Sequence, residues 1–413
     1  MSTTATAARP SVQRQTPSNY NYSIGYLRAA IVALVVAHHA ALAYHPLAAP
    51  IPASLLTPPY TWRTFPVVDG HRAAWAGVFA TVNDIFFMAL MFFISGLFVW
   101  KSLARKGASA YMRDRWLRLG LPFIPIALIL APLSYYPTNL QIRGHVSFGA
   151  FLIQFFAPGH WSAGPVWFLW VLLIFDWIAT VLFRRAPEWG AAVSALTTNA
   201  NRRPAIIFYG LVVMTAILYV PFALVFNPYR WAAFGPFNFQ LSRLLLYLAY
   251  FMAGVAVGAQ GLDRGLLATS GRLARRWPLW IIAAVCAYLA WNYAQNQFFS
   301  RPIPHTLREA LTSVPLMSWL LLFAVSCAAS SFAVMAVFVR FANRQMRYFD
   351  SLAANSYGIF LFHFIFVIWL GYFLLAAPLA ALAKFLLVFA GSLTLSWLVT
   401  AQLRRIPAIA RII

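Results

Sequence analysis

The sequence predicts an all-α, polytopic helical membrane protein with about ten transmembrane helices and both termini in the cytoplasm. Of its 413 residues, 62% are hydrophobic and only 9% are charged, whereas soluble domains contain about 25% charged residues. The apolar runs are long enough to cross a bilayer, and the basic residues lie in short clusters between them. The net charge of +23 therefore indicates membrane topology, and no nucleic-acid partner is expected.

Ten apolar runs reach the roughly 20 residues that a membrane span needs. An even number of spans places both chain ends on the same side of the membrane. The predicted spans are 24–45, 76–100, 119–137, 165–183, 205–226, 241–260, 278–297, 313–339, 349–372 and 381–401.

The basic residues indicate which side of the membrane each loop faces, because loops rich in Lys and Arg stay in the cytoplasm. The loops on the other side hold few basic residues but many prolines and aromatic residues, which favours ordered caps. The basic loops are 101–118, 184–203, 264–276 and 340–347, and the opposite loops include 46–66, 137–165 and 227–240.

The chain divides into a disordered cytoplasmic tail (1–22), one transmembrane domain (23–402) and a short basic cytoplasmic tail (403–413). The first tail resembles a targeting peptide in composition, but a cleaved signal would have a shorter apolar stretch, without the Arg28 and His39 found here. Cys286 and Cys327 both lie in apolar segments, so neither a disulfide nor a metal site is expected.

Arg28 and His39 are the sharpest polar pair within a span. Eleven residues apart in a helix, they are about 20° apart around the axis and about 16 Å apart along it, so they share a face. His38 is rotated about 80° from that line. The alternative is that Arg28 extends to the interface and His39 is a hydrogen-bonded packing residue.

Two other spans contain polar residues that share a face. In the second span these are Asp84 and Ser95, and in the ninth Ser356 and His363. Asp84 cannot face lipid, and it either orients a histidine, pairs with an arginine in the site, or forms a purely structural ion pair. His363 is either a functional histidine or one that packs between helices.

Arg115 and Arg118 precede Pro122 and would be neighbours on one side if the segment is helical. Paired guanidinium groups suit phosphates or phosphorylated cofactors. Ordinary positive-inside charge would explain the number of basic residues here, but not this paired placement.

In these segments the sequence resembles the acyltransferase-3 family of integral membrane O-acyltransferases over most of its length. Arg28 with His39 is similar to the family's first-helix signature. The other matching segments are Phe92-Phe93-Ile94-Ser95-Gly96-Leu97, Arg115-x-x-Arg118 with Pro122, Val166-Trp167-Phe168-Leu169, and Ser356-Tyr357-Gly358-Ile359-Phe360-Leu361-Phe362-His363.

The chain departs from the family pattern at a few positions. Leu97 and Phe360 replace residues that are often Phe and Tyr in the family. The doublet His38-His39, followed by His45, leaves the choice of catalytic histidine open. Within the family, this histidine tract resembles that of stand-alone members that modify glucans or other glycans.

The resemblance implies transfer of a small acyl group, acetyl or succinyl, from acyl-CoA in the cytoplasm to a hydroxyl of a carbohydrate or other acceptor, in a bacterial inner membrane. Acyl-CoA is then a co-substrate, and no bound cofactor is expected. His39 would act as general base, with Arg28 and Asp84 as its catalytic partners. A transient acyl-histidine is a second route. Arg115 and Arg118 would bind the donor, with Ser95, Trp167, Ser356 and His363 as further binding residues.

Two other classes of protein are alternatives. A proton-coupled transporter would use His39, Asp84 and His363 as a proton relay and Arg28 to bind an anionic substrate. The spans, however, show neither an inverted repeat nor an obvious pair of Gly/Pro-broken helices. A structural subunit would leave the deep arginine and histidines unexplained.

Overall fold

The computed structural model describes residues 22–48, 63–157, 160–190, 192 and 200–413, and the predicted tail at 1–22 lies outside them except for its last residue. Within these residues, nine helical segments are long and apolar enough to cross a membrane, and a tenth is gained if the bent pair α12 and α13 counts as one span. The all-α membrane fold is therefore confirmed, and each of the ten predicted spans overlaps a helix.

The bounds of the helices follow the apolar runs. The longer helices are α1 (Tyr22–Leu42), α3 (Ala74–Gly96), α7 (Ala131–Arg143), α9 (Trp167–Arg185), α11 (Pro204–Phe226), α12 (Leu244–Gln260), α14 (Trp277–Phe299), α16 (Val314–Phe341), α17 (Arg347–Phe373) and α18 (Ala381–Leu403). The short α-helices are α4 (Val99–Lys106), α5 (Ala108–Arg115), α6 (Leu121–Pro125), α8 (Phe148–Phe155), α13 (Arg272–Arg275), α15 (Leu307–Thr312) and α19 (Pro407–Ala410).

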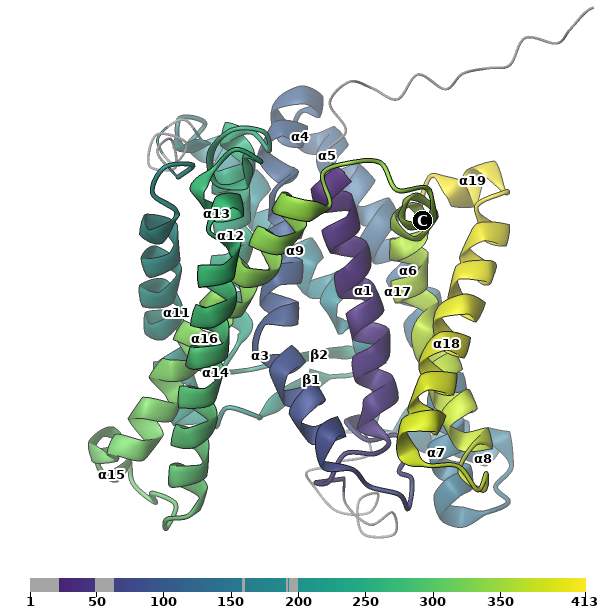
Figure 1. Cartoon of the computed structure of the whole chain (residues 1–413). Coiled ribbons are helices and arrows are strands. Elements are labelled where there is room, and N and C mark those ends of the chain that lie inside the picture. The colour runs from purple at the N-terminus through teal and green to yellow at the C-terminus, as the bar shows by residue number, and fades with distance from the viewer. Residues whose placement is uncertain (1–21, 49–62, 158–159, 191, 193–199) are drawn as a thin grey trace, which may run out of the picture.

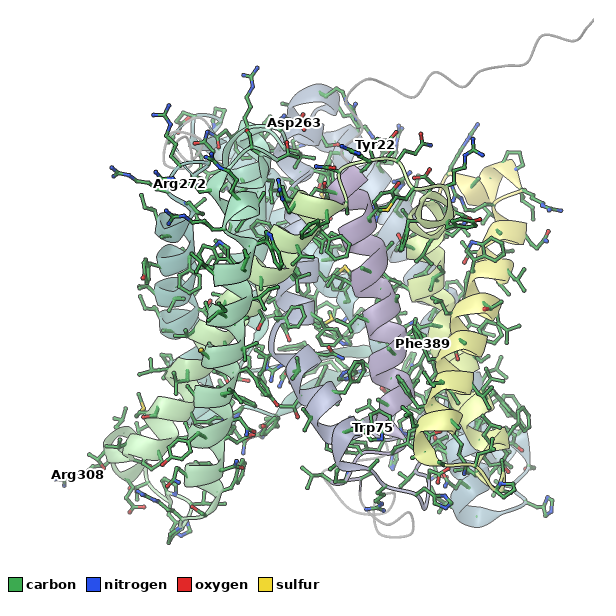
Figure 2. The ribbon with its side chains drawn as sticks, in the orientation of Figure 1. Tyr22, Trp75, Asp263, Arg272, Arg308 and Phe389 are labelled. Atoms are coloured by element: carbon green, nitrogen blue, oxygen red, sulfur yellow. The ribbon has the colours of Figure 1, made fainter. Side chains whose placement is uncertain are left out.

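Helix α1 is central to the bundle and packs against α3, α16, α17 and α18. Figure 1 shows α11, α14 and α16 on one side of it and α17 and α18 on the other. The start of α1 and the C-terminus lie at the same end of the bundle. In Figure 2, Tyr22, Asp263 and Arg272 lie at that end, whereas Trp75 and Arg308 lie at the opposite end.

Glycines allow α3 and α12 to pack with their backbones in contact. A Cβ on Gly254 would lie 2.0 Å from the carbonyl oxygen of Phe93, and one on Gly96 would lie 2.2 Å from that of Phe251. Gly258 packs in the same way, one turn after Gly254. Small residues spaced by four are a common means of bringing membrane helices together, because packing replaces the hydrophobic effect there.

The third span is longer than predicted, since residues 108–143 form one continuous helical path. It contains two π-helical segments, η2 (Trp116–Gly120) and η3 (Ile126–Leu130), which come shortly before Pro122 and Pro132. Proline lacks an N–H and displaces the carbonyl one turn earlier, and a wider turn accommodates both effects. The segment 101–118, expected as a basic loop, is therefore helical except at Gly107.

A β-hairpin in the segment 227–240 was not predicted. Strands β1 (Trp231–Phe234) and β2 (Phe237–Gln240) are antiparallel, with Trp231 opposite Gln240. Figure 1 shows the hairpin at a height between the two ends of α1, and not beyond them. The indole N–H of Trp170 in α9 donates to Asn238 O at 3.2 Å, so α9 fixes the hairpin against the bundle.

Candidate active site

Two histidines from distant parts of the chain meet inside the bundle. His39 lies in the last turn of α1, and His363 lies in the second half of α17, with their ring centroids 5.2 Å apart. Phe364 packs edge-on against the ring of His39 at 5.4 Å. Because α1 is surrounded by other helices and His363 is fully buried, the pair faces protein and not lipid.

Backbone carbonyls fix the tautomer of both rings. Nδ1 of His39 lies 2.8 Å from Val35 O, and Nδ1 of His363 lies 2.7 Å from Phe360 O. A carbonyl only accepts, so each Nδ1 must carry the proton that it donates. In the neutral ring, Nε2 then holds a lone pair and is able to take a proton. His363 Nε2 has no hydrogen-bond partner among the described residues.

The other two histidines of the first tract have different surroundings. The ring of His38 turns towards α3 and packs on Phe87 at 5.0 Å, and its Nδ1 is buried without a hydrogen-bond partner in the described part of the chain. His45 lies beyond the end of α1, and its Nδ1 accepts from the Leu47 N–H at 3.1 Å. Burial lowers the pKa of His45, which keeps it neutral and suits that bond.

Small cavities lie beside the histidine pair. One, of about 10 Å³, is lined by His39, Tyr44 and Val67 among others, and another of the same volume by His363 and Ser134 among others. Such a volume holds about one water molecule. A larger ligand entering either of these two cavities therefore needs side chains there to move.

Arg28 and Ser356 converge on one backbone carbonyl. The guanidinium of Arg28 donates to Ala353 O at 3.3 Å, and the hydroxyl of buried Ser356 donates to the same oxygen at 2.9 Å. Arg28 and His39 thus both contact α17, ten residues apart along it, because α1 and α17 run parallel. The shared face predicted for Arg28 and His39 is the face towards α17.

Asp84 pairs with an arginine, and the structure does not place it on His39. Its carboxylate lies 2.7 Å from the guanidinium of Arg243, which also donates to Asp84 O at 3.0 Å. Of the expected alternatives, the structure thus has Asp84 paired with an arginine, and the Nδ1 of His39 is bonded to Val35 O instead. Sequence reasoning missed Arg243 because it lies at the edge of an apolar run, where arginines are ordinary.

Arg115 and Arg118 have different partners. Arg115 lies 3.4 Å from the buried carboxylate of Asp176, which also accepts from the hydroxyl of Tyr111. Arg118 is exposed, and its backbone carbonyl accepts from the hydroxyl of Tyr357. This contact joins the arginine segment to the helix that carries His363. Asp176 was also missed, although an acid inside an apolar run was a usable signal.

Ser95 and Trp167 make other contacts. The hydroxyl of Ser95 donates to Met91 O at 2.9 Å, within its own helix. The indole of Trp167 packs against Tyr247 at 5.8 Å and against Trp231 of the hairpin at 5.5 Å. Trp167 therefore belongs to the surroundings of Arg243, and its contacts are not with the histidine pair.

A buried ion pair lies beside the segment that follows the end of α1. Lys384 in α18 lies 2.7 Å from the carboxylate of Asp69, and both side chains are almost fully buried. The N–H of Asp69 donates to Ala43 O at 2.9 Å, which holds the segment after residue 63 against the end of α1. Within the described ranges, no group of three or more His, Cys, Asp or Glu side chains is placed to hold a metal ion.

The fold defines a polytopic helical membrane protein. Its candidate site holds two histidines whose protonated nitrogens are fixed by carbonyls, and Arg118 is joined to α17, the helix that carries His363. The family model described as an acyltransferase domain, that of acyltransferase-3, matches residues 21–401. The chain belongs to the acyltransferase-3 family and is a membrane acyltransferase. Comparison with curated proteins and with solved structures gives no match.

Proposed function

We propose that this acyltransferase moves a small acyl group, acetyl or succinyl, from acyl-CoA to a hydroxyl of a carbohydrate, with His39 as general base. The observation that supports this most is the hydrogen bond from His39 Nδ1 to Val35 O, which leaves Nε2 as the basic nitrogen. The donor, the acceptor class and the location in a bacterial inner membrane are what the family resemblance implies.

In this mechanism the acceptor hydroxyl gives its proton to His39 Nε2 while its oxygen attacks the thioester carbonyl. The C–S bond then breaks, and the CoA thiolate leaves and takes up a proton. His363, 5.2 Å away, lines the same site and helps to position the acyl group. In the alternative route, Nε2 itself attacks the thioester carbonyl and the CoA thiolate leaves; the acceptor oxygen then attacks the acyl-histidine, loses its proton and takes the acyl group, and the N–C bond breaks to restore the ring.

The donor is expected to approach along α17. Arg118 is exposed and joined through its backbone to Tyr357, which lies six residues before His363 on that helix. Its guanidinium suits a CoA phosphate. Arg28, also exposed, is bonded to Ala353 O one turn before Tyr357 on the same helix, and its guanidinium suits another phosphate of the donor.

The test is acyl transfer by the purified protein in lipid nanodiscs. Labelled acetyl-CoA and succinyl-CoA are offered with a panel of oligosaccharides, and released CoA thiol and acylated sugar are measured. His39→Ala should lower the transfer rate by about 10² to 10⁴ while leaving the protein folded. His305→Ala, at an exposed histidine, is the matched control. Full activity in His39→Ala, or no consumption of either thioester by the wild type, would refute the proposal.

A further inference from the structure

An accessible carboxylate lies deep along α3. Asp84 is ten residues inside the helix, about 15 Å from its start, yet 43% of its side-chain surface is accessible. An ionised carboxylate is too costly to expose to hydrocarbon. The accessible face of Asp84 must therefore meet water and not lipid.

Arg243 is the buried partner of this carboxylate. Its side chain is only 4% exposed, it packs over the ring of Phe323 at 4.8 Å, and its Nε is buried with no hydrogen-bond partner among the described residues. The charge of Arg243 is neutralised by Asp84 at 2.7 Å. The accessible member of the pair is thus an acceptor of hydrogen bonds, which suits hydroxyl donors and repels anions.

Tyrosines surround the pair. Tyr219, Tyr229 and Tyr247 all lie close enough to interact with the charge of Arg243. Tyr219 and Tyr247 are buried, whereas Tyr229 is 48% exposed. The hydroxyl of Tyr229 accepts from the side-chain amide of Gln295 at 3.1 Å.

Indole rings extend the same surface. Trp231, 45% exposed on the hairpin, packs against Trp167, which in turn packs against Tyr247. Aromatic faces beside a carboxylate and an amide form the combination that binds sugars, since the rings cover C–H faces and the polar groups bond the hydroxyls.

We propose that the surface formed around Asp84, Arg243, Tyr229 and Gln295 binds the carbohydrate acceptor, as a neutral polyhydroxylated ligand. Only the identification of this ligand as the acceptor rests on the proposed function, because the binding site itself is argued from contacts. This surface lies on the α3 side of α1, where His38 packs on Phe87, one turn after Asp84. Acceptor and donor would thus reach the histidines from different neighbours of α1, namely α3 and α17.

The experiment measures binding and turnover separately. Wild-type protein in nanodiscs is applied to an array of neutral and anionic oligosaccharides without acyl-CoA, and the tightest ligand is then used as acceptor. Tyr229→Ala and Gln295→Ala should each weaken binding and raise the acceptor KM by about tenfold, with the donor KM unchanged. Asp84→Asn should have a larger effect. Tyr293→Ala is the matched control, because Tyr293 is exposed on the same helix, two residues from Gln295 and about 200° away around its axis.

Each outcome decides one question. Equal binding in the wild type and in the Tyr229 and Gln295 variants, or binding by the wild type to no neutral oligosaccharide, would overturn this proposal. Neutral sugar binding that depends on these residues, without any thioester consumption, would sustain the binding site and reject the proposed acyl donor. Thioester consumption that is lost in His39→Ala, with an acceptor KM that the Tyr229 and Gln295 variants leave unchanged, would reject this binding site and sustain the proposed acyl donor.

Discussion

His38 and His39 are adjacent in the chain but face different helices. Successive residues of a helix are 100° apart, so His39 meets His363 on α17 while His38 meets Phe87 on α3. The rings touch each other edge-on at 5.4 Å. Of these two neighbours, His39 is the one whose Nδ1 is bonded to a carbonyl, which leaves its Nε2 as a base.

We therefore predict that His38→Ala affects acyl transfer much less than His39→Ala. Loss of the His38 ring removes a contact with Phe87, which should cost at most about tenfold in rate, against about 10² to 10⁴ for the general base. Transfer rates at saturating acceptor compare the two variants. A dead His38 variant beside an active His39 variant would show that the base faces α3.

Arg115 is a structural partner as well as a candidate for binding. We predict that Arg115→Ala destabilises the protein by about 3 to 5 kcal/mol, because it leaves the carboxylate of Asp176 buried and unpaired. Asp176→Asn in the same chain should recover most of this loss. Thermal unfolding in detergent, followed by tryptophan fluorescence, provides the measurement. Equal stability of the single and double variants would mean that the ion pair contributes little.

Arg118 allows the donor-binding role to be tested alone. Its side chain is exposed, so Arg118→Ala should leave stability within about 0.5 kcal/mol. The KM for acyl-CoA should rise, and Arg118→Lys should restore it only in part, because an ammonium lacks the bidentate fork. An unchanged donor KM in Arg118→Ala would mean that this arginine does not bind the donor and only contributes to the positive charge of a cytoplasmic loop.

Many residues of the candidate site could be predicted from the sequence, but the ion pairs that they form could not. Helical geometry placed Arg28 and His39 on one face, and the family motif pointed to His363. The partners Arg243, Asp176 and Lys384 lie 61 to 315 residues along the chain from the residues with which they form ion pairs. Such contacts depend on how helices pack, which residue spacing within one span does not determine.

At the scale of elements, apolar length predicted the spans better than the connections. Ten runs became helices because a backbone in hydrocarbon must satisfy its own hydrogen bonds. The hairpin was missed because its alternating aromatic residues are too few to stand out, and its stability comes from α9. The π segments follow from prolines, whose effect on a helix is local.

The contact between α3 and α12 gives a prediction about packing. Gly254→Ala should destabilise the protein by about 1 to 3 kcal/mol, since the new methyl would lie 2.0 Å from the carbonyl oxygen of Phe93. Gly210→Ala is the matched control, because a Cβ at this helical position in α11 has no atom within 4 Å. It should be neutral or stabilising, as alanine favours helix over glycine. Equal unfolding temperatures for the two variants would argue against a close helix contact.

At the scale of the whole molecule, charge is distributed unevenly between the two ends. The described parts of the basic segments, 184–190, 200–203, 264–276 and 340–347, lie at or next to the end where α1 begins and the chain terminates. Arg118 also lies towards that end, bonded through its side chain to Arg411 O at 3.3 Å. The candidate donor residue Arg118 and the basic loops are thus at one end of the bundle.

We predict that the basic end faces the cytoplasm, because Lys and Arg are retained there during insertion. Paired reporters, one active only in the cytoplasm and one only outside it, are fused after Arg411 and at Gly107, and for comparison at Gly144 and Ser300. The first two fusions should report the cytoplasm, and the second two the opposite compartment, since Figure 1 places α7 and α15 at the other end. An extracytoplasmic signal at Gly107 would reverse the topology, and acyl-CoA could then no longer reach Arg118 from the cytoplasm.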